Sequence, residues 1–132
     1  MIGVDTNVLL RLLLDDDADQ ARRARALVAA AAEAHEPVFV NRAVLCETLW
    51  VLGRGYRFDR NQIARAVELL LAAPALRLED HAAVDEALTV FRAGTLGFVD
   101  ALIGVLNRRA GCATTYTFDR RAAEAGEFTA VE

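Results

Sequence analysis

Lysine and serine are absent from the 132-residue sequence, so each of its 15 basic residues is an arginine. Without lysine the chain can form no Schiff base and has no P-loop lysine, and without serine it has no serine nucleophile. The two cysteines, Cys46 and Cys112, stand far apart in apolar surroundings and match no zinc motif with His35 or His81. We therefore expect buried, reduced thiols and no zinc site.

Long uncharged runs are also missing, because none approaches the roughly 18 residues that a membrane-spanning helix needs. The net charge of -4 excludes a general coat of positive potential but leaves room for arginines gathered on one face. With 55% hydrophobic residues the chain can bury one full core and is too short for two. We expect a single domain over residues 1–132, a folded strand at its start and a cytoplasmic location.

Short β-branched or aromatic runs alternate with segments of helical periodicity. We expect strands at 2–4, 38–40, 76–78, 113–118 and 128–131. Helices are expected at 8–14, from the acidic stretch 15–19 to about 33, at 42–52, about 60–73, 81–91 and 98–110, with a short one after 119. Asp59 with Gln62 has the spacing of a capping box, and Asp80 is expected to cap its helix. The alternation predicts an α/β fold, a three-layer α/β/α sandwich with a central parallel sheet.

Four acidic residues stand apart from other charges: Asp5, Glu47, Asp100 and Asp119. Each interrupts a segment whose composition suggests burial, and a buried carboxylate needs a partner. Asp5 and Asp119 end predicted strands, whereas Glu47 and Asp100 fall in early turns of helices. Such positions converge at the carboxyl ends of parallel strands, so we expect one shared pocket. A divalent cation would relieve the mutual repulsion of these carboxylates.

An all-oxygen ligand set suits a hard ion, and an open cleft suits Mg²⁺, with Mn²⁺ as its substitute. Such an ion can lower the pKa of a bound water and stabilise the leaving oxygen in phosphodiester hydrolysis. Thr6, Asn7 and Thr117 flank the acids and are candidates for orienting carboxylates or metal-bound water. Gly104 and Asn107 follow Asp100 at helical spacing and are expected to keep that helix face small and polar near the ion.

Each isolated acid also has a structural interpretation. Asp5 and Asp119 could cap the helices that follow them, and Asp100 suits the first turn of a helix. Glu47, in the middle of an apolar helix, has the weakest alternative of this kind. Trp50 is expected in the core or at an interface rather than as a base-stacking platform. The candidates for contact with phosphates, which could equally serve solubility, are Arg11, Arg42, Arg120 and Arg121.

Four segments carry a family resemblance in their order and spacing: residues 2–11, the helix with Cys46 and Glu47, residues 98–103, and residues 117–120. Together they resemble a PIN-domain ribonuclease of the VapC-like toxin class, from type II toxin-antitoxin pairs. The resemblance spans almost the whole chain. It implies a PIN-like sandwich and Mg²⁺- or Mn²⁺-dependent endonucleolytic cleavage of RNA. The implied metal site consists of Asp5, Glu47, Asp100 and Asp119, supported by Thr6, Asn7 and Thr117.

The same resemblance implies a homodimer that is silenced by a small, DNA-binding antitoxin. Many relatives carry a further acid two residues after the last aspartate, where this chain has Arg121. Without this acid a ligand for a second ion is missing. We then expect Asp119 to act on the ion through water and Arg121 to contact the RNA backbone. The rival hypothesis is a catalytically silent PIN-like module that binds RNA or protein, and the complete set of four acids argues against it.

Overall fold

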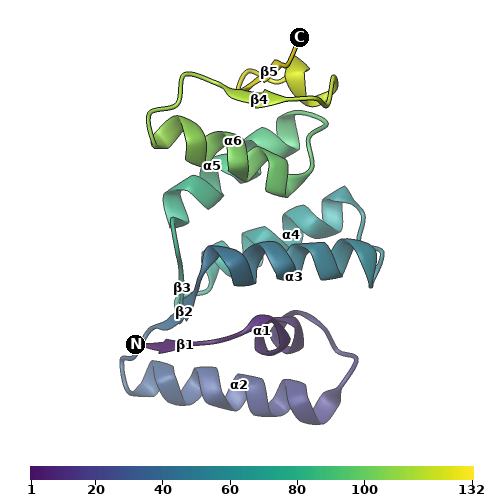
Figure 1. Ribbon diagram of the computed structural model, residues 1–132. Coiled ribbons are helices and arrows are strands. Elements are labelled where there is room, and N and C mark those ends of the chain that lie inside the picture. The colour runs from purple at the N-terminus through teal and green to yellow at the C-terminus, as the bar shows by residue number, and fades with distance from the viewer. The chain divides into compact units, whose positions relative to one another are not determined.

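The computed structural model describes residues 1–132 and divides into two compact units. Residues Met1–His81 form the N-terminal unit and Ala82–Glu132 form the C-terminal unit. Helices and strands alternate along the chain, as Figure 1 shows. Every strand pairs with its neighbour in parallel. The prediction of an α/β fold built on parallel strands is confirmed, with the strands grouped as three in the N-terminal unit and two in the C-terminal unit.

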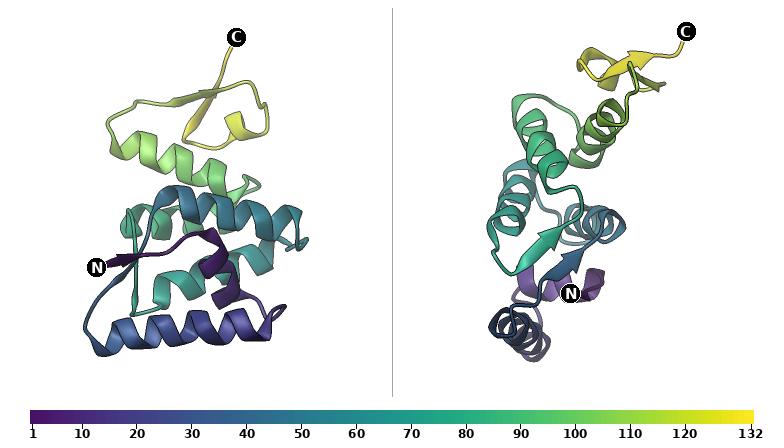
Figure 2. Two further views of the ribbon diagram at one scale, coloured as in Figure 1. Left: turned by 60° about the horizontal axis from the view of Figure 1, so that its bottom comes forward. Right: turned by 90° about the vertical axis from the view of Figure 1, so that its left-hand side faces the viewer.

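A three-stranded parallel sheet of order β1-β2-β3 organises the N-terminal unit. Its strands are β1 (Ile2–Gly3), β2 (Val38–Val40) and β3 (Leu76–Leu78). The helices of the unit are α1 (Thr6–Leu13), α2 (Ala18–Glu33), α3 (Arg42–Arg54) and α4 (Arg60–Ala72). Helix α1 packs between α2 and α3, an arrangement visible in Figure 1 and in both views of Figure 2. The carboxyl end of β1 therefore leads directly into a helix that is covered on two sides.

Polar residues begin the four helices of this unit by accepting a hydrogen bond from a backbone N–H three residues later. The N-cap residues are Asp5, Asp17, Asn41 and Asp59, with N···O distances of 2.8–3.1 Å. The predicted capping box of Asp59 and Gln62 is confirmed, because Gln62 also accepts from the Asp59 N–H at 2.8 Å. These caps explain why the helix starts were readable from sequence.

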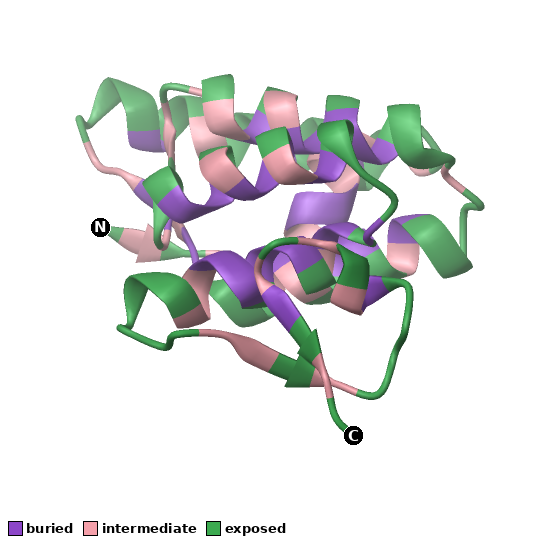
Figure 3. Cartoon of the chain, turned by 90° about the horizontal axis from the view of Figure 1, so that it is seen from above, coloured by how far each residue is buried: buried purple, intermediate pink, exposed green.

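Aliphatic side chains fill the interior of the N-terminal unit, with Leu9, Val38, Leu45 and Leu52 almost wholly removed from solvent. Figure 3 shows buried segments on one side of each helix and exposed segments on the other. Such one-sided burial is what an amphipathic helix provides. The core thereby fixes which face of α1 and α3 remains open to solvent.

The C-terminal unit packs helices against a two-stranded parallel sheet. It contains α5 (His81–Ala93), which begins at the boundary between the units, α6 (Phe98–Arg109), β4 (Thr115–Thr117), the short 3₁₀ helix η1 (Ala122–Glu124) and β5 (Phe128–Ala130). Phe91 and Phe98 meet edge to face with ring centroids 5.8 Å apart. At Gly104 an added Cβ would lie 2.8 Å from the Cβ of Glu127 and 2.9 Å from the Phe128 ring, so glycine lets α6 approach β5.

The 62% exposure of Trp50 excludes the core and leaves the other predicted place for this residue, an interface. Two predictions about individual residues are wrong. Both thiols are free, as expected, but Cys112 is exposed and Cys46 is only half-buried. Asp80 has a backbone φ of 56°, outside the extended region of an N-cap, and its carboxylate pairs with Arg42 instead. No helix combines the length and the apolar character that crossing a membrane would require.

Candidate functional site

The junction between β1 and α1 places two of the predicted residues at one point of the N-terminal unit. Asp5 leaves the sheet directly after the backbone bond from the Val4 N–H to the Phe39 carbonyl. Its Oδ1 accepts from the Val8 N–H at 3.1 Å, which confirms the capping interpretation, while Oδ2 accepts no hydrogen bond from within the N-terminal unit. Thr6 is the first residue of α1 and is buried with 9% exposure. Its side chain is therefore directed by packing.

Helix α3 brings Glu47 to the same place. The hydroxyl of Thr6 donates a short hydrogen bond to Glu47 Oε1, across 41 positions of sequence. The second oxygen of this carboxylate accepts no hydrogen bond from within the N-terminal unit, and the residue is exposed. Asn41 begins α3 and accepts from the Val44 N–H at 2.8 Å through its Oδ1, so its amide group is held at the start of the same helix. The Thr6 hydroxyl thus orients Glu47 without neutralising it.

These side chains line one cavity of about 680 Å³ in the N-terminal unit. The predicted site residues among its walls are Asp5, Thr6, Asn7, Arg11 and Glu47, and the others include Asn41 and Tyr56. The structure therefore brings together five of the predicted site residues, four from the segment 5–11 and one from α3. Asn41 and Tyr56 line the same cavity and were not among the predicted site residues.

Arg11 lies at the edge of this cavity in a network with two neighbours. Its guanidinium pairs with the Asp16 carboxylate, and the Tyr56 hydroxyl donates to the other Asp16 oxygen at 2.5 Å. The hydrogen bonds from Tyr56 and Arg11 lower the pKa of Asp16, and the bond to Asp16 raises the pKa of Tyr56. The Nε of Arg11 is buried and has no hydrogen-bond partner. At neutral pH the network holds an ionised carboxylate and a neutral phenol.

The chemistry of the cavity fits a hard divalent cation. Asp5 and Glu47 each offer one unpartnered carboxylate oxygen, Asn7 and Asn41 add amide groups, and no histidine or cysteine lines the wall. Oxygen ligands of this type suit Mg²⁺ or Mn²⁺ rather than zinc. Within neither unit do three His, Cys, Asp or Glu side chains gather as a complete ligand cluster. The N-terminal unit by itself therefore offers two carboxylates that could hold a cation.

The other two predicted acids lie in the C-terminal unit. Asp119 follows β4, and its Oδ1 accepts from the backbone N–H groups of Arg121 at 2.9 Å and Ala122 at 3.3 Å. The Thr117 hydroxyl accepts from the Asp119 N–H at 3.0 Å. Asp100 occupies the first turn of α6, where a carboxylate is favoured by the helix dipole, and is exposed. The structural interpretation of Asp100 is confirmed. The N-cap residue of η1 is Arg121 rather than Asp119, so Asp119 holds the turn before this helix without occupying its N-cap position. Both carboxylates remain accessible.

Two expectations about the surroundings of the acids are wrong. Asp5, Glu47, Asp100 and Asp119 are all exposed, although the sequence around each of them is largely apolar. Burial therefore supplies no reason for them to need a partner. Gly104 and Asn107 contact the strands of the C-terminal unit, whereas they were expected to keep a helix face small and polar near an ion. Gly104 packs closely against Phe128 of β5. The Asn107 side chain donates to the Thr115 hydroxyl at 2.9 Å, which joins α6 to β4.

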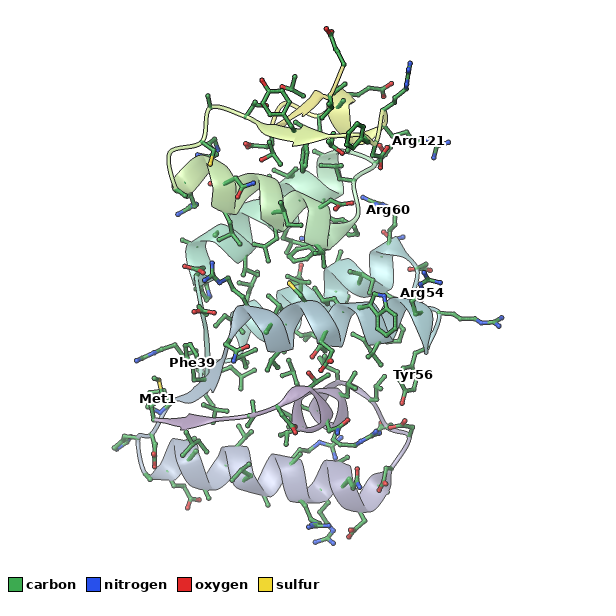
Figure 4. The ribbon with its side chains drawn as sticks, viewed as in Figure 1. Met1, Phe39, Arg54, Tyr56, Arg60 and Arg121 are labelled. Carbon is green, nitrogen blue, oxygen red and sulfur yellow. The ribbon has the colours of Figure 1, made fainter.

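The arginines differ in how far they are already engaged. Arg42 pairs with Glu79 and Asp80 through its Nε, at 3.3 and 3.2 Å, so the guanidinium ties α3 to the end of β3. Arg120 and Arg121 are exposed in the turn after β4, and Figure 4 labels Arg121 there. Their side chains are more available to an anionic ligand than that of Arg42. The structural role of Arg42 was not foreseen.

Asn41 and Tyr56 differ in the signal that could have identified them. Asn41 follows β2 and begins a helix, as Asp5 does after β1, so the repeated order of strand, polar residue and helix was available in the sequence. Tyr56 follows Gly55, the residue at the end of α3. It reaches the cavity only because the chain turns back after the helix, a placement that no local pattern indicates.

A model of the PIN domain family matches residues 2–127, nearly the whole sequence and parts of both units. The chain therefore belongs to the PIN domain family. Among curated proteins it is similar to a VapC ribonuclease of Aquifex aeolicus, with 28% identity over 120 residues that cover 89% of this chain and 87% of that protein. Among solved structures it matches Mycobacterium tuberculosis VapC20, described as a sarcin-ricin loop cleaving toxin, with 26% identity, 98% coverage of each chain and a TM-score of 0.43.

Proposed function

We propose that this protein is a toxin of the VapC type, a metal-dependent endoribonuclease that hydrolyses RNA phosphodiester bonds. The observation that carries the proposal is the cavity that gathers Asp5 and Glu47 with an unpartnered oxygen on each. Membership of the PIN family and the likeness to a VapC ribonuclease support it. We further propose that residues 1–132 form a single PIN domain, because the family match covers both units.

The proposed metal ligands and catalytic groups are the carboxylates of Asp5, Glu47, Asp100 and Asp119. When bound, Mg²⁺ or Mn²⁺ would supply an activated water and stabilise the leaving oxygen. Thr6 orients Glu47, and Asn7 presents its amide to the cavity. Thr117 fixes the turn at Asp119. Arg11, Arg120 and Arg121 are proposed to meet the RNA backbone, whereas Arg42 is assigned its structural ion pairs.

Cleavage of a structured RNA by the pure protein tests this function. We expect cleavage with Mg²⁺ or Mn²⁺, none with excess chelator, and none for the Asp5→Asn and Asp100→Asn variants. Cleavage that survives both substitutions would identify a contaminating nuclease. If the wild-type protein cleaves nothing with either ion, the silent PIN-like binding module becomes the better account.

Partners and location complete the proposal. We propose a cytoplasmic homodimer that is neutralised by a small DNA-binding antitoxin, as the relatives named above are toxins or ribonucleases of this type. The exposed Trp50 is the kind of side chain that is enriched at protein interfaces. A short reading frame for a DNA-binding protein immediately upstream, whose product co-purifies and stops cleavage, would support the pairing. A monomer in solution would contradict the dimer.

A further inference from the structure

We propose that Tyr56 stacks an unpaired base of the RNA substrate beside the carboxylate cavity, and that Asp16 positions the tyrosine for this contact. The inference rests on the proposed ribonuclease function, to which it adds a residue that would contact the substrate. It follows from the place of Tyr56 in the cavity wall, from the network that anchors its hydroxyl, and from the partial exposure of the residue.

The turn after α3 fixes the backbone of Tyr56. The Gly55 N–H donates to the Val51 carbonyl at 2.7 Å, and the Tyr56 N–H donates to the same oxygen at 3.3 Å. A Cβ at Gly55 would lie 2.9 Å from that oxygen, so a larger residue would open the turn. The Phe58 N–H then bonds the Leu52 carbonyl at 3.0 Å. Tyr56 is therefore held in a tight, hydrogen-bonded turn.

The far end of the side chain is anchored as well. Figure 4 shows Tyr56 extending from the turn after α3 toward the loop between α1 and α2, where Asp16 lies. The hydroxyl donates to Asp16 Oδ2 at 2.5 Å, while Oδ1 of the same carboxylate pairs with Arg11. Both oxygens of Asp16 are thus engaged. An aromatic ring fixed at both ends loses little conformational freedom when a ligand binds to it.

The ring also has the right neighbours and enough open surface. Tyr56 is the only aromatic residue in the wall of the cavity that contains Asp5 and Glu47, and 39% of its surface is exposed. Base stacking on an aromatic ring is tolerant of sequence but needs a base that is free of its own stack. A paired base would offer no face to Tyr56. The geometry therefore favours an unpaired nucleotide next to the phosphate to be cleaved.

Fluorescence of 2-aminopurine in a short single-stranded RNA tests the inference in the presence of chelator, so that no cleavage occurs. We expect the wild-type protein to quench the probe by stacking. Tyr56→Leu should lose the quench and bind roughly 5- to 150-fold more weakly, the range expected for one stacked base. Tyr56→Phe keeps the ring but loses the bond to Asp16, so its quench and its affinity should lie between those of the wild-type protein and Tyr56→Leu. The same probe within a duplex should not be quenched by any variant.

Tyr116→Leu is the matched control, because Tyr116 is a more exposed tyrosine on β4 that does not line this cavity. It should bind and quench as the wild-type protein does. The inference is overturned if wild-type protein neither binds nor quenches, if Tyr56→Leu behaves as wild type, or if Tyr56→Phe loses as much as Tyr56→Leu. The last result would assign Tyr56 only a structural hydrogen bond to Asp16.

Photo-crosslinking keeps the inference testable if Tyr56→Leu does not fold. RNA carrying 5-iodouridine, irradiated with wild-type protein, should yield an adduct on Tyr56 in mass spectra of its peptides. Adducts confined to other residues would overturn the proposal. If the quench depends on Tyr56 but the protein shows no metal-dependent cleavage, only the nuclease function is refuted. If the protein cleaves RNA but the quench does not depend on Tyr56, only the stacking is refuted.

Discussion

In the N-terminal unit, Glu47 accepts a hydrogen bond from the Thr6 hydroxyl and shares a cavity with Asp5, whereas in the C-terminal unit Asp119 is held by the backbone N–H groups of Arg121 and Ala122. Backbone donors are supplied by any residue other than proline, so the turn at Asp119 tolerates changes in its neighbours. The orientation of Glu47 depends on one hydroxyl. The comparison predicts that substitutions around the two acids will have unequal effects.

Asp5→Asn should have the largest effect, a loss of RNA cleavage of more than about 100-fold, because a carboxylate ligand of the metal is removed. Asparagine caps a helix as well as aspartate does, so the free energy of unfolding should change by less than about 0.5 kcal/mol. Cleavage rates and melting curves measure the two effects. Asp17→Asn, the same change at the N-cap of α2, should alter neither, and equal losses in both variants would assign Asp5 to capping alone.

Thr6→Val should reduce activity by about 10- to 100-fold, as expected for loss of a group that orients a metal ligand. The concentration of Mg²⁺ or Mn²⁺ needed for half-maximal cleavage should rise, while the fold persists because valine fills the same volume. Thr48→Val is the control, since Thr48 is buried on α3 and bonds only the Val44 carbonyl. A normal metal requirement in Thr6→Val would show that Glu47 needs no orienting hydroxyl.

Asp119→Asn should cost about 10-fold in cleavage, less than Asp5→Asn, because the amide keeps the backbone hydrogen bonds of the turn and water can bridge to an ion. Thr117→Val should cost less than Thr6→Val, since the Thr117 hydroxyl only accepts from a backbone N–H. The measurement is the rate of RNA cleavage by all four variants at the same metal concentration, which ranks Asp119→Asn against Asp5→Asn and Thr117→Val against Thr6→Val. The reverse order would show that the C-terminal acid contributes more to the metal site.

Mn²⁺ should stabilise the folded protein. An ion that binds only the native state raises the free energy of unfolding by about 2.7 kcal/mol when its concentration is about 100 times its Kd. A thermal melt should move up by several degrees as Mn²⁺ is titrated. The shift should shrink in Asp5→Asn and persist in Asp17→Asn. An unchanged Tm over the whole titration of the wild-type protein would argue against a metal site at the carboxylates.

Asp16→Asn should have the smallest effect, a pH-dependent loss of stability. The folded state lowers the pKa of Asp16, so the contribution of this carboxylate is present at neutral pH and is lost as pH falls through its folded pKa, below about 4. Denaturation of the two proteins should therefore differ at pH 7 and converge in acid. A difference that is constant with pH would exclude ionisation as its cause.

The same network makes an alkaline prediction. Asp16 raises the pKa of Tyr56, so phenolate formation, followed by absorbance in a Tyr116→Phe background, should occur at lower pH in Asp16→Asn. The pKa of Tyr56 is raised only in the folded state, so the bond between the neutral phenol and Asp16 stabilises the fold at neutral pH. This stabilisation is lost as pH rises above about 10 and the phenol ionises. Identical titration curves with and without Asp16 would remove the anchor proposed for the Tyr56 ring.

Local chemistry explains most of what could be predicted about the fold. β-Branched residues favour the strand at Val38–Val40, and Asp59 with Gln62 forms the capping box that begins α4. Gly111, with a φ of 101°, follows the end of α6. Each of these signals acts within a few positions of the sequence. The same rules placed Asp5 and Asp119 at the carboxyl ends of strands. They could not state how far the rest of the fold would cover each side chain, which is why Cys112 was expected to be buried although it is exposed.

The sequence by itself determined the alternation of strands and helices, the identity of the isolated acids and the membership of the PIN family, because these depend on residue order and spacing. Tertiary structure alone decided that Thr6 bonds Glu47 across 41 positions, that Arg42 is engaged by Glu79 and Asp80, and that Tyr56 enters the wall of the acidic cavity. Each of these contacts joins segments that are distant along the chain. Packing of the core sets their separation, and no local propensity encodes it.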